Sequence, residues 1–191
     1  MGERRIMKEM NEVVQTTFRN TVAFLPSEME LMPLSRWNES VFRYYFCRFL
    51  ATAYPEVEQY IECGKIDLVL RRSPLVAFIE FKFYRHPRRF DPYDGRSHGF
   101  KGGPGRKNLR EFQACIDKLH ERPSTPDLSK YVVLVYADPT DGSRPSLQFS
   151  HQYNEYHHSR DNVALRLVES SRPVSTTDGI VRAQLYGVDL S

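Results

Sequence analysis

The most apolar runs of the sequence contain charged residues. Residues 65–71 (KIDLVLR) and 74–84 (PLVAFIEFKFY) have the composition of buried strands, and a short turn joins them. They nevertheless carry Asp67, Glu80 and Lys82. An ionised group is costly to bury unless it is paired with an opposite charge or binds a metal. These three residues are therefore the first candidates for a functional site.

The spacing of apolar residues also predicts helices. An amphipathic pattern over residues 3–20 predicts an N-terminal helix that ends before Pro26. Residues 37–53 are almost wholly apolar, so we expect a second helix there that is largely buried. A third helix is predicted to begin at Asn108, in a sequence close to a capping box, and to end before Pro123.

The remaining patterns predict a mixed sheet. A strand at 130–139 follows the third predicted helix, so we expect it to lie parallel to an earlier strand, with helices on both faces of the sheet. The fold class is therefore α/β, in the order αβββαβ with a β-rich C-terminal extension. The predicted strands are 57–63, 65–71, 74–84, 130–139, 162–170 and 179–188.

Length and composition add the domain organisation. A chain of 191 residues suits one domain with a sizeable core. We divide that domain 1–191 into an N-terminal helical extension (1–36), a core (37–137) and a C-terminal extension (138–191). No apolar leader and no run long enough to span a bilayer is evident, so we expect a cytoplasmic protein without a membrane partner.

Three cysteines carry little functional information. Cys47, Cys63 and Cys115 are far apart, and none forms the CxxC spacing of a zinc site or a redox pair. We expect reduced, buried thiols at all three positions.

Positive charge is concentrated in one segment. The net charge of the whole chain is only +3, yet residues 85–110 hold six arginines and two lysines against two aspartates, a local charge of +6. The segment also holds five of the ten glycines and has no apolar periodicity, which predicts a long mobile loop. Because it directly follows Lys82, we interpret it as a nucleic-acid contact, the alternative being a solvated loop. The candidate contacts are Arg85, Arg88, Arg89, Arg96, Lys101, Arg106, Lys107 and Arg110.

Strand geometry brings the three charged residues together. Alternate residues of a strand share a face, so Glu80 and Lys82 point to the same side. The turn folds the preceding strand back, which places Asp67 beside Glu80. Two close carboxylates repel each other, and a divalent cation that binds their oxygens reverses this cost. Mg²⁺ or Mn²⁺ suits oxygen ligands, and the absence of a nearby His or Cys set argues against zinc.

These residues resemble a known nuclease motif. Asp67, twelve intervening residues and then Glu80-Phe81-Lys82 are similar to the PD-(D/E)xK phosphodiesterase superfamily, the restriction-endonuclease-like nucleases. The resemblance covers residues 37–137 and implies a restriction-endonuclease-like core. It implies that Asp67 and Glu80 bind the metal, with the backbone carbonyl of Phe81 as a third ligand. It also implies that Lys82 orients or deprotonates the attacking water.

Two helical residues extend the candidate site. Many superfamily members place a glutamate on the first core helix, and Glu39 is the candidate for this catalytic and metal-binding position. It shares an apolar stripe with Phe42 and Phe46, although a first-turn glutamate is also favoured by the helix dipole. Gln113 resembles the catalytic glutamine of exonuclease-like members. Asp117 stands where those members carry a tyrosine, which disfavours the exonuclease branch.

We therefore expect a Mg²⁺- or Mn²⁺-dependent nuclease that hydrolyses phosphodiester bonds. The resemblance favours DNA over RNA, and the missing tyrosine favours an endonuclease. A homodimer is one possible assembly, because each chain has one site. The main alternative is a non-catalytic nucleic-acid-binding domain that retains the nuclease fold. A domain that binds a small molecule or a protein is the third reading, and a plain ion-pair network is the structural alternative for the charged residues.

Overall fold

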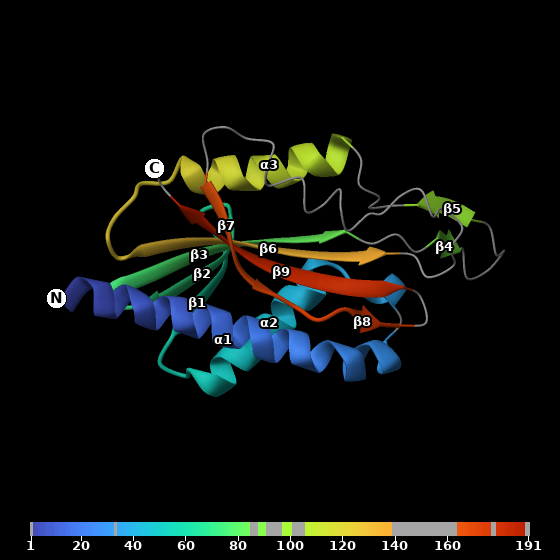
Figure 1. Ribbon diagram of the computed structural model, residues 1–191, viewed down its shortest axis with the longest axis horizontal. Coiled ribbons are helices and arrows are strands. Elements are labelled where there is room, and N and C mark those ends of the chain that lie inside the picture. Colours follow the sequence, from blue (N-terminus) through green and yellow to red (C-terminus); the bar gives the residue numbers. More distant parts are fainter. Residues whose placement is uncertain are drawn as a thin grey trace.

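A central sheet of seven strands separates two layers of helices (Figure 1). The helix α3 covers one face of the sheet, and α1 and α2 cover the other. The structure is a computed structural model that describes residues 2–32, 34–84, 88–90, 97–100, 106–138, 164–176 and 179–189. The helices are α1 (Gly2–Leu31), η1 (Leu34–Arg36, a 3₁₀ helix), α2 (Glu39–Ala53) and α3 (Arg106–His120). The strands are β1 (Glu58–Cys63), β2 (Ile66–Arg72), β3 (Leu75–Tyr84), β4 (Arg88–Phe90), β5 (Ser97–Phe100), β6 (Leu128–Asp138), β7 (Ala164–Ser170), β8 (Val174–Ser175) and β9 (Ile180–Asp189).

The strand order is β1-β2-β3-β6-β9-β7, and β8 pairs with β9. The first three strands form an antiparallel meander, and β6 lies parallel to β3. This parallel pairing was expected, because the chain crosses over through α3 before it returns to the sheet. The strands β7 and β9 continue the same sheet in antiparallel pairing. The predicted α/β class, with a mixed sheet flanked by helices, is confirmed.

Each face of the sheet has its own apolar core. On one face, Leu68 and Phe81 cluster with residues of α1 and α2, such as Phe46. On the other face, Val132 and Leu134 cluster with residues of α3. The β3–β6 register sets Glu80 opposite Val132 and Lys82 opposite Leu134. Because opposite residues share a face, the side chains of Glu80 and Lys82 both leave β3 on the side covered by α3, and at the end of the pairing the Lys82 ammonium reaches Glu39 of α2.

The N-terminal helix is longer than predicted. We expected it to end before Pro26, but α1 continues through this residue to Leu31. A proline inside a helix removes a hydrogen bond and crowds the preceding turn. Leu25 and Met29 on either side are buried in the core, so tertiary packing outweighs the local preference.

Burial was overestimated at two places. The second helix, α2, buries one face only, and Tyr44 on the other face is 61% exposed. The buried residues of α2 include a charged one, Arg43. Cys63 is exposed because it lies in the edge strand β1, and Cys47 on α2 is only half-buried, whereas Cys115 is buried as expected.

The basic segment also differs from the predicted loop. It contains the short antiparallel strands β4 and β5, and α3 begins at Arg106, two residues before the predicted start. In the C-terminal part, the predicted strands are present as β7 and β9, with β8 between them. Over the described part of the chain, no helix is long and apolar enough to cross a membrane.

Candidate functional site

The candidate site lies where the pairing of β2 and β3 ends. The register runs up to Leu68 opposite Ile79, and side chains then replace the backbone as acceptors. The backbone N–H of Asp67 donates to Oε1 of Glu80 at 3.2 Å, and the backbone N–H of Phe81 donates to Oδ2 of Asp67 at 2.8 Å. One oxygen of each carboxylate is therefore held by the backbone of the neighbouring strand, which fixes the orientation of the other oxygen.

The second oxygen of each carboxylate faces a cation from a helix. Oε2 of Glu80 lies 2.6 Å from Nζ of Lys118 on α3. Oδ1 of Asp67 lies 3.9 Å from Nη1 of Arg43 on α2, a distance too long for a hydrogen bond. The same Nη1 donates to the backbone carbonyl of Asp67 at 3.3 Å. The outward oxygen of Asp67 is thus attracted by a positive charge without being tightly held by it.

Lys82 is held by the start of α2. Its Nζ donates to Oε2 of Glu39 at 3.1 Å. The helix begins at Glu39 because the side chain of Asn38 caps it by accepting from the backbone N–H of Val41. Arg43 follows Glu39 by four residues, so both project from the same side of α2 toward the strands. The first-turn glutamate thus contacts a motif residue of β3.

Burial and neighbouring charges shift the pKa values of the site. Burial raises the pKa of Glu80 above its ordinary value, although the hydrogen bond from Lys118 opposes this shift. Burial likewise raises the pKa of Glu39, against the opposing effect of Lys82. Glu80 is only 1% exposed, so its ionised form needs a positive partner in the pocket.

For Lys82, the effect of neighbouring charges on the pKa outweighs the effect of burial. Burial alone would lower the pKa of its ammonium, but Cys115, Glu39 and Asp67 raise it above the ordinary value. Burial raises the pKa of the Cys115 thiol to about 12, so this thiol is neutral near pH 7. The two carboxylates are therefore the charges that keep Lys82 protonated at neutral pH.

The donor set can be compared with the needs of a divalent cation. Among the residues that the structure describes, no group of three or more His, Cys, Asp and Glu side chains is arranged to hold a metal ion. The two outward oxygens of Asp67 and Glu80 are nevertheless hard donors of the type that Mg²⁺ and Mn²⁺ prefer. The residues fit such an ion on one condition: Lys118 must leave Oε2 of Glu80.

Phe81 and Gln113 contribute in different ways from the motif carboxylates. The ring of Phe81 packs against Phe42 and Phe46 on the face covered by α2, while its backbone N–H binds Asp67. Gln113 lies on α3 five residues before Lys118. At about 100° per residue, this spacing places the two side chains on opposite flanks of the buried stripe of α3.

The basic candidates are only partly described. Arg85, Arg96 and Lys101 lie outside the described residues. Arg88 and Arg89 belong to β4, and Arg106 is the first residue of α3, but their side chains also lie outside that part.

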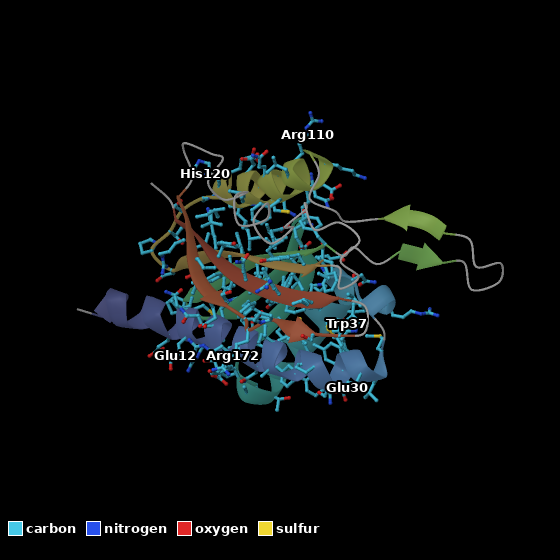
Figure 2. All side chains as sticks on the ribbon, turned by 45° about the vertical axis from the view of Figure 1, so that its right-hand side comes forward. Glu12, Glu30, Trp37, Arg110, His120 and Arg172 are labelled. Atoms are coloured by element: carbon cyan, nitrogen blue, oxygen red, sulfur yellow. The ribbon has the colours of Figure 1, made fainter. Side chains whose placement is uncertain are left out.

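The first turns of α3 lie next to the end of β3. The hydroxyl of Tyr84, two residues after Lys82, donates to the backbone carbonyl of Asn108. Lys107 is exposed, and its Nζ lies 3.8 Å from Oε1 of Glu111. Arg110 projects outward from α3 (Figure 2). Two exposed cations therefore stand on the helix that begins beside the candidate site.

Sequence reasoning missed two cations of the site, Arg43 and Lys118. Arg43 could have been found from its position four residues after Glu39. Lys118 offered no such signal, because a basic residue in the last turn of a helix is commonly explained by the helix dipole.

Comparisons with known proteins give no assignment. No protein-family model, curated protein or solved structure matches this chain.

Proposed function

We propose that this chain is a Mg²⁺- or Mn²⁺-dependent nuclease that hydrolyses phosphodiester bonds, with DNA as substrate and endonucleolytic cleavage. One observation carries the proposal: Asp67 and Glu80 each have one oxygen bound to backbone and one turned toward a cation, beside the ammonium of Lys82. The element order α2-β1-β2-β3-α3-β6 supports a restriction-endonuclease-like core, since this is the order that the sequence motif implies.

Each residue has a chemical role in this proposal. Asp67, Glu80 and the carbonyl of Phe81 would hold the cation, which supplies Lewis acidity and neutralises phosphate charge. Because Lys82 is protonated at neutral pH, it acts as a hydrogen-bond donor and a positive charge. It therefore orients the attacking water and stabilises charge that develops on the phosphate. Glu39 positions the ammonium of Lys82 by accepting a hydrogen bond from it.

The nucleic-acid contact rests on the location of the basic residues. Lys107 and Arg110 are exposed near the N-terminus of α3, where the backbone N–H groups of the first turn and the helix dipole add affinity for phosphate. The chain enters this helix from the basic segment that follows Lys82. The choice of DNA over RNA rests on the resemblance of the motif alone.

One contact favours a second candidate, a non-catalytic nucleic-acid-binding domain with the same fold. Lys118 lies 2.6 Å from an oxygen of Glu80 that a metal would use. If this ion pair is permanent, the charged residues stabilise the end of the sheet and nothing else.

A cleavage assay separates the two candidates. The purified chain is incubated with supercoiled plasmid, single-stranded DNA and RNA, in Mg²⁺, in Mn²⁺ and in EDTA. Glu80→Gln is the test variant. Glu169→Gln, which alters a glutamate of β7 that pairs with Arg19 of α1, is the matched control.

We expect metal-dependent nicking and linearisation of the plasmid by the wild type and by Glu169→Gln, with loss of cleavage in Glu80→Gln. Binding of nucleic acid without cleavage in any metal would favour the second candidate. Cleavage of RNA alone would overturn the choice of substrate.

A further inference from the structure

Lys118 makes two contacts that differ in kind. Its Nζ lies 2.6 Å from Oε2 of Glu80, a buried carboxylate of the candidate site. The same Nζ donates to the backbone carbonyl of Lys65 at 2.6 Å. The side chain is 31% exposed, so solvent reaches one side of it while the other side covers Glu80.

The second contact belongs to a clamp between α3 and the turn that joins β1 to β2. Gly64 and Lys65 both have positive φ angles, 57° and 69°, which is the conformation of a two-residue type I′ turn. The carbonyl of Lys65 accepts from Lys118, and the carbonyl of Gly64 accepts from Arg122, which lies two residues after the end of α3. Lys118 is therefore anchored to the turn by a bond that does not involve Glu80.

This arrangement makes Lys118 and a divalent cation competitors for one oxygen. Both are positive, so they cannot occupy Oε2 of Glu80 together without strong repulsion. The other oxygen, Oε1, already accepts a hydrogen bond from the backbone N–H of Asp67, so a metal ion displaces the partner of Oε2 more easily than the partner of Oε1. An ion that enters the site must displace the ammonium from Glu80, while the bond to Lys65 keeps the side chain close by.

We propose that Lys118 is a tethered internal countercation that neutralises Glu80 in the metal-free protein and is displaced by the entering divalent cation, so that it sets the metal affinity of the site. The inference rests on the proposed function, because it assumes that Asp67 and Glu80 are metal ligands. It assigns Lys118 a positioning role and gives the buried carboxylate of Glu80 a countercharge before the metal arrives.

The competition has a measurable consequence. Lys118 and the metal ion compete for Glu80, so each weakens the binding of the other by the same factor. Removal of the Lys118 charge must therefore tighten metal binding. We expect a gain of about tenfold in Mn²⁺ affinity, within the usual range of such couplings.

The test is calorimetric titration of the full chain with Mn²⁺ at about pH 8, above the ordinary titration range of carboxyl groups. Lys118→Met removes the charge. Lys118→Gln removes it but keeps a donor for the carbonyl of Lys65, which covers the case that the methionine variant does not fold. Lys118→Arg keeps the charge. Arg122→Met is the matched control, because it removes a cation from the same clamp but not from Glu80.

The expected result is tighter Mn²⁺ binding by Lys118→Met and Lys118→Gln, with affinities near that of the wild type for Lys118→Arg and Arg122→Met. Binding by the two neutral variants but not by the wild type would support the inference in its strongest form. If the wild type binds Mn²⁺ and the neutral variants bind it equally or more weakly, the inference is wrong while the nuclease proposal stands. If none of the proteins binds Mn²⁺ or Mg²⁺, both are wrong.

Discussion

The face of the sheet covered by α3 holds two lysines, the half-buried Lys82 and the buried Lys130, in very different surroundings. Lys82 in β3 donates to the carboxylate of Glu39 at 3.1 Å, whereas Lys130 in β6 donates to the backbone carbonyl of Arg122 at 2.6 Å. Neighbouring charges raise the pKa of Lys82 against the effect of its burial, and burial alone lowers the pKa of Lys130.

Both lysines stand in apolar strands, so the pattern of residues does not separate them. The separation comes from what surrounds each ammonium: carboxylates at the end of the β2–β3 pairing, and a main-chain carbonyl at the start of β6. A lysine among carboxylates can stabilise negative charge that develops near it. A lysine capped by a carbonyl has a structural role.

The largest expected effect is on turnover. Lys82→Ala should lower the cleavage rate by about a hundredfold or more, because it removes the positive charge beside the carboxylates. Lys130→Ala should leave the rate per folded molecule unchanged. Rates are measured on supercoiled plasmid in Mg²⁺, after circular dichroism has confirmed that both variants are folded. Equal losses in the two variants would remove the distinction between the lysines.

A smaller effect is expected on the free energy of unfolding when the ion pair between Lys118 and Glu80, close to Lys82, is broken. Lys118→Met leaves the buried carboxylate of Glu80 without its cation, and we expect a loss of about 2 kcal/mol in the free energy of unfolding. The double variant Lys118→Met/Glu80→Gln should recover part of this loss, because the uncompensated charge is gone. Urea denaturation without metal gives both values. A double variant less stable than Lys118→Met would show that the ion pair is not the source of the effect.

The smallest effect is a difference in alkaline pH dependence. In the folded state, the pKa of Lys130 lies below its ordinary value of 10.5. Between the folded pKa and 10.5 the unfolded state holds more protons than the folded state, so the contribution of Lys130 to the free energy of unfolding rises with pH. The folded pKa of Lys82 lies above 10.5, so its contribution is constant below 10.5 and is lost as pH rises through the folded value.

The measurement is the difference in free energy of unfolding between the wild type and each alanine variant, from about pH 8 to 10.5. The wild type should gain stability relative to Lys130→Ala over this range and stay constant relative to Lys82→Ala. The same slope for both variants would contradict the two opposite pKa shifts.

Local geometry explains why part of the site could be predicted. The period of two in a strand places Glu80 and Lys82 on one face, and the tight turn after β2 brings Asp67 opposite Glu80. These relations depend on neighbours within about twenty residues along the chain. The parallel step from β3 to β6 followed from the helix between them, for the same reason.

The two cations from the helices depend on packing that is not local. Arg43 reaches Asp67 only because α2 lies across the strands, and Lys118 reaches Glu80 only because α3 is clamped to the β1–β2 turn. The helix boundary at Pro26 was missed for a similar reason, since burial of Leu25 and Met29 outweighs the local cost of the proline. Patterns along the chain identify the strand residues of the site but not the countercharges that surround them.

The central claim is that Asp67 and Glu80 form a metal site beside Lys82, and calorimetric titration with Mg²⁺ and Mn²⁺ tests it most directly. We predict that the wild type binds Mn²⁺, that Glu80→Gln binds it at least about tenfold more weakly because a charged ligand is lost, and that Lys82→Ala binds it equally or more tightly because a nearby positive charge is removed. A wild type that binds neither ion, or a Glu80→Gln variant with unchanged affinity, would contradict the claim.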